Sequence, residues 1–231
     1  MGTTRADKHK GEEGMNQKSE NQLEIFRQEN PTLSSQLSGI SSAVEKITEC
    51  YKSGGTILVC GNGGSASDSE HIVGELMKGF LKKRPLTEEE IHRLKAVAEG
   101  EEEAAWISSH MQRGIPAISL VSQSALTTAF ENDVEPKLVF AQQVMGYGRQ
   151  GDVFIGLSTS GNSANVVYGA KVAKSKGMTV IGFTGREDSK LSLVGDIVLR
   201  SSEKDTYKVQ EDHIKLYHLL CALVENELFE R

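Results

Sequence analysis

The sequence predicts a three-layer α/β domain built on a five-stranded parallel sheet. Five short runs are rich in apolar and β-branched residues and are nearly continuous in hydrophobicity, which is typical of strands covered on both faces. Helical patterns separate most of these runs, and strands that alternate with helices form parallel sheets. The length of 231 residues, with 38% hydrophobic and 25% charged side chains, suits one domain with a single large core.

The elements can be placed in order along the chain. Two helical patterns come first, at residues 20–29 and 33–53, with a break at Asn30-Pro31 and an end at Gly54-Gly55. A final helix over 204–229 has a broad apolar face that can pack on the sheet or on another subunit. Residues 1–19 are interpreted as a disordered leader or tag, and 20–231 as the domain. The strands are expected at residues 56–60, 117–121, 152–157, 179–183 and 197–199.

One segment interrupts the alternation of strands and helices. Residues 86–114 are acidic and helix-prone, which predicts a helical insert after the first βα unit. Its runs Glu88-Glu89-Glu90 and Glu101-Glu102-Glu103 are interpreted as solvated helix faces, with a lid or an oligomer contact as the alternatives.

Composition excludes several classes of protein. The net charge of -6 argues against a sequence-independent grip on nucleic acid, which needs a basic surface. No run approaches the roughly 20 apolar residues of a membrane span, and the polar N-terminus lacks the apolar centre of a signal peptide. Cys50, Cys60 and Cys221 show no spacing for a disulfide framework or a thiolate zinc site, so we expect buried thiols in the reducing cytoplasm.

The first strand ends in a glycine-rich loop that opens into a helix. Residues 61–66, GNGGSA, fit the dinucleotide fingerprint G-x-G-x-x-[GA]. That fingerprint also needs a second strand with an acidic end about twenty residues later, whereas the next strand here begins near Ala117. No lysine follows the glycines, which excludes a nucleoside-triphosphate loop. A smaller phosphorylated ligand is therefore expected.

The third strand ends in a similar loop, residues 158–163, STSGNS. Exposed N–H groups at a helix N-terminus, together with several hydroxyl donors, suit a phosphate dianion without a basic side chain. The alternative is ordinary capping, in which Ser160 or Asn162 starts the helix. Ligands bind beyond the carboxyl ends of parallel strands, so the two loops together favour a phosphorylated sugar. No serine lies in a G-x-S-x-G frame, which argues against a serine hydrolase.

Two pairs of polar residues near these loops are candidate catalytic or metal-binding groups. His71 and Glu75 lie one turn apart on the helix after the first loop, and Gln210 and His218 lie about two turns apart on the final helix. Moving a proton between C1 and C2 of a sugar phosphate needs a carboxylate base and a group that shuttles the hydroxyl proton. A divalent metal on the four residues could polarise the carbonyl. The alternatives are a solvated His71–Glu75 pair and a core His218.

Four motifs resemble the sugar isomerase (SIS) domain of the phosphoheptose isomerase family: CGNGGSASDSEHIVGEL, STSGNSANVV, KGMTVIGFTG and VQEDHIKLYHLL. The resemblance runs from about Glu45 to the C-terminus and implies a flavodoxin-like SIS fold. It implies an isomerase that converts sedoheptulose 7-phosphate into D-glycero-D-manno-heptose 7-phosphate through an enediolate, for heptose-containing surface glycans. It further implies a homotetramer with sites built from more than one subunit.

The resemblance also implies a role for each site residue. Glu75 is expected to be the base and His218 the partner acid/base. One zinc ion per subunit is expected on His71, Glu75, Gln210 and His218. The expected substrate contacts are Asn62, Gly63, Gly64, Ser65, Glu75, Asn132, Asp133, Ser158, Thr159, Ser160, Ser163 and Gln210.

Two features depart from the family pattern. The insert replaces a link that is usually short, and Tyr207 stands where an acidic residue is expected three positions before Gln210. Non-catalytic SIS modules that bind phosphosugars or proteins share much of this scaffold, but those resembling this chain lack residues equivalent to Glu75 and His218. A regulator of that kind and an isomerase of another phosphosugar are the alternatives to the phosphoheptose isomerase.

Overall fold

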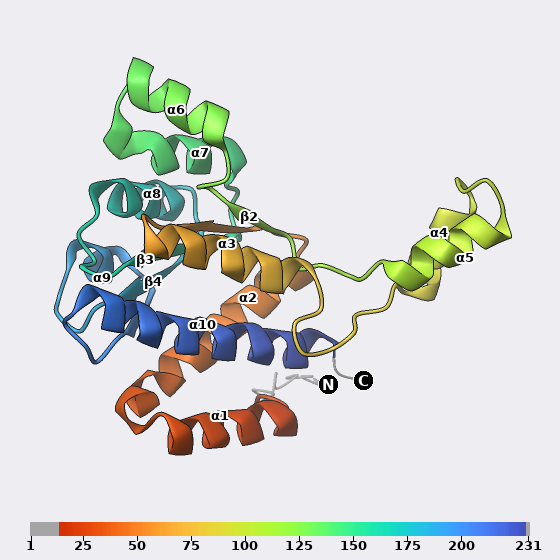
Figure 1. Ribbon diagram of the computed structural model, residues 1–231, viewed down its shortest axis with the longest axis horizontal. Helices are drawn as coiled ribbons and strands as arrows, with labels where there is room; N and C mark the ends of the chain where they lie inside the picture. The colour runs from red at the N-terminus through yellow and green to blue at the C-terminus, as the bar shows by residue number, and fades with distance from the viewer. Residues whose placement is uncertain (1–13, 230–231) are drawn as a thin grey trace, which may run out of the picture.

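The computed structural model describes residues 14–229, which form a three-layer α/β domain around one parallel sheet (Figure 1). The elements follow the predicted alternation of strands and helices. In chain order they are α1 (Gln17–Glu29), η1 (Pro31–Gln36), α2 (Leu37–Lys52), β1 (Ile57–Cys60), α3 (Gly64–Met77), α4 (Glu88–Lys95), α5 (Glu101–His110), β2 (Ala117–Ser119), α6 (Ser124–Asp133), η2 (Pro136–Leu138), α7 (Val139–Tyr147), β3 (Val153–Ser158), α8 (Ala164–Ser175), β4 (Thr179–Thr184), α9 (Lys190–Val194), β5 (Ile197–Arg200) and α10 (Thr206–Phe229).

The five strands form one sheet in the order β2-β1-β3-β4-β5, and every neighbouring pair is parallel. Side chains of β1 alternate between the two faces, so Ile57 and Val59 enter one core and Leu58 and Cys60 enter the other. Helices α2, α3 and α10 cover the first face, and α7, α8 and α9 cover the second. The predicted fold class is confirmed.

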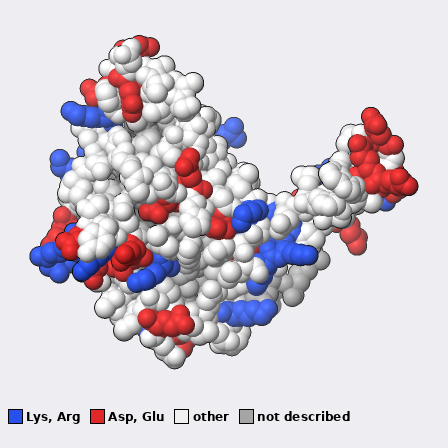
Figure 2. All heavy atoms as spheres, in the orientation of Figure 1, with Lys and Arg blue, Asp and Glu red and all other residues white. Residues whose placement is uncertain are grey.

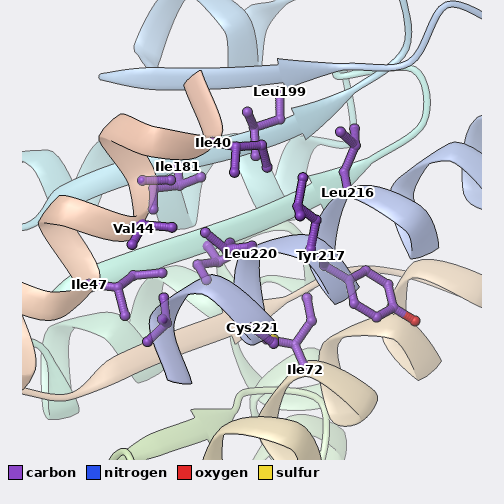
Figure 3. Close-up of a cluster of buried hydrophobic side chains, with 14 of the residues drawn as sticks. Ile40, Val44, Ile47, Ile72, Ile181, Leu199, Leu216, Tyr217, Leu220 and Cys221 are labelled. Atoms are coloured by element: carbon purple, nitrogen blue, oxygen red, sulfur yellow. The ribbon is translucent and has the colours of Figure 1, made fainter. Parts of the chain in front are cut away.

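The first core joins the sheet to the long C-terminal helix. Figure 3 shows Ile40 and Val44 of α2 facing Leu216 and Leu220 of α10 beneath the strands. Tyr217 belongs to the same core, but its ring extends toward α3 and carries its hydroxyl to the core edge. The apolar face of α10 therefore packs on its own sheet, and the Tyr217 hydroxyl reaches α3.

The start of the domain lies earlier than the sequence analysis placed it. Helix α1 begins at Gln17, because the side chain of Asn16 accepts a hydrogen bond from the backbone N–H of Ser19 at 3.0 Å and caps the helix. Residues 17–19 of the expected leader are thus helical, which corrects that boundary. Residues 1–13 of the expected leader lie outside the described residues.

The insert is helical, as predicted, and forms an arm of residues 86–111 in which α4 packs against α5 (Figure 1). Its ends meet at the body of the protein, where the Arg113 N–H donates to the Arg84 carbonyl at 2.7 Å. Figure 2 shows acidic side chains gathered at the far end of the arm, and Glu101-Glu102-Glu103 are exposed. Glu88 and Glu89 are exposed as well, whereas Glu90 is half-buried in the capping box at the start of α4. A solvated face therefore fits most of these charges in the single chain, and an oligomer contact stays a prediction.

Two further expectations concern the whole chain. Cys50, Cys60 and Cys221 are free and buried, as predicted. Within residues 14–229, none of the helices combines the length and apolar character that a bilayer crossing requires.

Candidate active site

The first glycine-rich loop turns the chain from β1 into α3 within three residues. Gly63 has a φ of 57°, which favours glycine, and a Cβ on Gly61 would overlap the backbone of Ser65. Ser65 itself is buried in the first turn of α3. The glycines are therefore needed for this turn, and they leave the N-terminal end of α3 beside the carboxyl end of the sheet.

The second loop connects β3 to α8 and is held together by its own hydroxyl groups. Ser158 donates to the Ser163 hydroxyl at 3.1 Å, and Ser160 accepts from the backbone N–H of Asn162 at 3.2 Å. Gly161 has a φ of 63°, and a Cβ there would overlap Ser189. Ser163 occupies the N-cap position of α8 without a side-chain capping bond. The N-cap residue of α8 is thus Ser163 and not Ser160 or Asn162, the two residues considered as caps from the sequence.

The two loops lie side by side because β1 and β3 are neighbours, with Cys60 paired to Gly156. The side-chain amides of Asn62 and Asn165 exchange two hydrogen bonds of 2.9 Å and link the first loop to α8. Gln210 contacts the first loop from α10, since a Cβ on Gly64 would overlap its amide group. The structure thus assembles both loops and the start of α10 into one cradle.

The candidate catalytic residues lie where α3 and α10 run next to each other. His71 Nε2 is 3.1 Å from Glu75 Oε1, and Lys78 Nζ lies 3.3 Å from Glu75 Oε2. The ring of His218 is 5.0 Å from that of His71 and 5.6 Å from that of Phe80, between ring centres. Three of the four predicted polar residues on these helices, His71, Glu75 and His218, are therefore close together.

The surroundings of His218 favour its neutral form. Burial is the main cause that lowers the pKa of His218, the neighbouring His71 lowers it further, and Glu75 opposes the shift. A neutral imidazole near pH 7 can accept a proton at one nitrogen and donate one at the other.

Sequence reasoning missed two residues that contact this group, Asp68 and Tyr217. The Tyr217 hydroxyl lies 2.9 Å from His71 Nδ1 and donates to Asp68 Oδ1 at 3.3 Å. Burial is the main cause that raises the pKa of Tyr217, with Asp68 adding to it, and burial also raises the pKa of Asp68. The contact of Asp68 could have been predicted from the sequence, because Asp68 lies one turn before His71 on the same helix. No local pattern indicates that the hydroxyl of Tyr217 contacts His71.

Asn132 and Asp133 are not joined to the cradle. They end α6, where Asn132 donates to the Asp133 carboxylate at 2.8 Å, and both are exposed. Across residues 14–229, neither makes a hydrogen bond to either loop. In Figure 1, α6 lies beyond α7, on the other side of α3 from α10.

The four candidate zinc ligands match the needs of zinc only in part. Zinc accepts imidazole and carboxylate ligands at about 2.0–2.2 Å, so that tetrahedral neighbours lie about 3.4 Å apart. The His71–Glu75 separation of 3.1 Å is close to this, and the other nitrogen of His71 is already occupied by Tyr217. Gln210 instead packs on Gly64, and in the described part of the chain no three His, Cys, Asp or Glu side chains are arranged around a metal position. His71 and Glu75 on α3 are therefore spaced as two zinc ligands would be. Gln210 and His218 on α10 do not complete a ligand shell with them.

Fold and loops together define a SIS domain. A family model with that description, SIS domain, matches residues 26–115 and 109–185. Phosphoheptose isomerases from Aneurinibacillus thermoaerophilus and Thermodesulfovibrio yellowstonii are 34% and 38% identical to this chain. These matches cover 82% and 84% of this chain, and 82% and 83% of the two relatives.

Solved structures of phosphoheptose isomerases are also similar to this chain. Phosphoheptose isomerases from Neisseria gonorrhoeae and Francisella tularensis superpose with TM-scores of 0.66 and 0.67, at 29% and 27% identity. Both matches cover 90% of this chain, and 92% and 94% of the two solved chains. The chain belongs to the phosphoheptose isomerase family of SIS domain proteins, as its four motifs predicted.

Proposed function

We propose that this protein is an aldose–ketose isomerase that interconverts sedoheptulose 7-phosphate and D-glycero-D-manno-heptose 7-phosphate. The observation that carries the proposal is the placement of the Glu75 carboxylate and the His218 imidazole on facing sides of α3 and α10. Both helices begin at the cradle, so a substrate whose phosphate is held by the second loop would extend along them. The names of the relatives supply the choice of a seven-carbon sugar.

Glu75 and His218 have separate roles in this proposed reaction. Glu75 takes the proton from C1 of the ketose and returns it to C2, because a carboxylate beside a carbonyl-activated carbon is a competent base. His218 moves the hydroxyl proton between O1 and O2, so that the enediol collapses to the aldehyde with no net gain or loss of protons. Lys78 Nζ donates to Glu75 Oε2 at 3.3 Å and so helps to orient the carboxylate for the first step.

A zinc ion is a further part of this proposal. His71, Glu75, Gln210 and His218 would hold it, and when bound it would act as a Lewis acid on the sugar oxygens. Elemental analysis of protein purified without chelator tests its presence, with one zinc per chain as the expected result.

Assembly and location complete the proposal. His218 borders a hollow of about 260 Å³ whose lining combines apolar side chains, such as Ile25, Phe80 and Leu81, with the polar Gln22, Glu29 and Lys215. An apolar surface with a polar rim suits contact with another subunit. We therefore propose a homotetramer, for which light scattering should return four times the chain mass of 25.2 kDa. The three free thiols fit a cytoplasmic protein, which cell fractionation would test.

The activity test is an isomerase assay on a panel of phosphosugars, with and without zinc. Turnover of sedoheptulose 7-phosphate should fall by about 10²–10⁴-fold in Glu75→Gln, the range that general acid–base groups contribute. Glu70→Gln is the matched control, because Glu70 is an exposed carboxylate on the same helix and, among residues 14–229, accepts a side-chain hydrogen bond from Ser122 alone. An unchanged rate in Glu75→Gln would remove Glu75 as the base. Binding without turnover would indicate a regulator, and turnover of only another sugar a different isomerase.

A further inference from the structure

Tyr217 places the only polar atom of its side chain between two residues of α3. The residue is fully buried, with 0% of its surface exposed, and its ring packs in the core below the sheet (Figure 3). Its hydroxyl lies 2.9 Å from His71 Nδ1 and 3.3 Å from Asp68 Oδ1. Asp68 is also buried, at 7% exposure, so water does not compete freely for either contact.

The direction of these bonds follows from the single proton on the phenol. Tyr217 donates to the carboxylate of Asp68, which accepts but cannot donate when ionised. The phenolic oxygen then accepts from His71, and this requires the proton of the neutral imidazole to be on Nδ1. The pair therefore selects one of the two tautomers of His71.

This tautomer has a consequence at the other side of the ring. Nε2 carries a lone pair and points at Glu75 Oε1 at 3.1 Å, so two acceptors face each other. Such a contact is favourable only when a proton or a cation lies between the two atoms. Buried carboxylates that orient the far nitrogen of a histidine are the usual support of metal-binding imidazoles.

We propose that Tyr217 and Asp68 are positioning residues that hold His71 in the Nδ1–H tautomer and thereby present its Nε2 lone pair to zinc beside Glu75. The zinc in this inference rests on the proposed function. Tyr217 acts through its hydroxyl alone, since its ring is part of the apolar core. Asp68 acts by fixing the direction in which that hydroxyl donates.

Tyr217→Phe tests the inference, because it removes the hydroxyl and keeps the buried ring. Zinc affinity, measured by competition with a chromophoric chelator, should fall by about 10–100-fold. Two-bond ¹H–¹⁵N spectra of the metal-free protein should show the Nδ1–H tautomer of His71 in the wild type and its loss in the variant. Tyr51→Phe is the matched control. Within the described chain its hydroxyl accepts a hydrogen bond from Arg113 alone, at 3.1 Å, so the variant should change neither readout.

Asp68→Asn is the second variant, in case the first does not fold, and it should shift both readouts in the same direction. An Nε2–H tautomer in the wild type, or a zinc affinity of Tyr217→Phe within twofold of wild type, overturns the inference. A wild-type protein that binds no zinc also overturns it. The isomerase assay separates this inference from the proposed function. Turnover without zinc would support the isomerase activity but not the positioning of His71 for zinc. Zinc binding without turnover would support the positioning role but not the isomerase activity.

Discussion

Replacing Glu225 with alanine is expected to destabilise the protein more than any change on its surface. Glu225 and Arg84 form an ion pair at 2.8 Å in which both side chains are 0% exposed. Glu225 also accepts the backbone N–H groups of Phe80 and Leu81, at 2.9 and 2.8 Å. The variant would leave the buried charge of Arg84, and the N–H groups of Phe80 and Leu81, without this acceptor.

The size of the effect follows from the burial. Removing one member of a buried ion pair costs about 3–5 kcal/mol, because the remaining charge stays out of water. For a chain of this length, that corresponds to a fall in Tm of about 6–20 °C. Arg84→Met combined with Glu225→Gln removes both charges and should cost less than Glu225→Ala alone. The matched control is Glu89→Ala, whose partner Arg93 is 68% exposed and whose loss should cost less than about 1 kcal/mol.

Urea and thermal unfolding followed by circular dichroism would measure these differences at one fixed protein concentration. A loss below 1 kcal/mol in Glu225→Ala would refute the reasoning, since it would mean that Arg84 finds water or another acceptor. The same pair also bears on the site. Arg84 donates to the carbonyls of Leu76 and Glu75 at 2.7 and 3.2 Å, and so holds the end of the helix that carries the candidate base.

Three further outcomes are expected. His213 is buried, and burial lowers its pKa to about 4, below its ordinary value of 6.5. The unfolded chain therefore binds more protons than the folded protein between these two pH values. The free energy of unfolding, measured with urea, should fall by about 2 kcal/mol from pH 7 to pH 5. If His213→Gln shows the same dependence of stability on pH as the wild type, this histidine is not the cause. Replacing the arm with a short glycine linker should leave Tm nearly unchanged, because the chain ends at its base are already joined by a backbone hydrogen bond; a fall of 10 °C would show that the arm supports the core. Gly64→Ala should displace the movable side chain of Gln210, and so lower turnover with little change in Tm. Gly61→Ala should lower Tm, because its Cβ would meet the backbone of Ser65. Equal effects of the two variants on Tm would contradict this distinction.

Local sequence patterns predicted most of the fold. Each of the five apolar runs is a strand with ends within two residues of the expected ones, because a doubly covered strand must be apolar on both faces. The start of α1 was missed because Asn16 caps it within a segment that reads as polar throughout. The arm was recognised as helical, but its projection from the body follows from how its two ends meet at Arg84 and Arg113.

Part of the candidate site could also be predicted from local sequence patterns. The glycines and hydroxyl residues of both loops stand in the sequence because the turns require them, and a helical repeat places Glu75 one turn after His71. Neighbouring strands bring the loops together, so their juxtaposition could also be predicted. Asn132 and Asp133 came from the resemblance alone, and within the described chain the fold does not join them to the cradle.

The sequence by itself determined the order of strands and helices, the two loops and the residues able to carry isomerase chemistry, because these depend on local periodicity and on turn geometry. Only the tertiary structure decided which of those residues meet. The bonds from Tyr217 to His71 and Asp68 span 146 and 149 residues, and the pair between Arg84 and Glu225 spans 141. These contacts arise because α10 returns along α3 to cover the sheet, and a pattern within a few helical turns carries no information about a partner so far away in the chain.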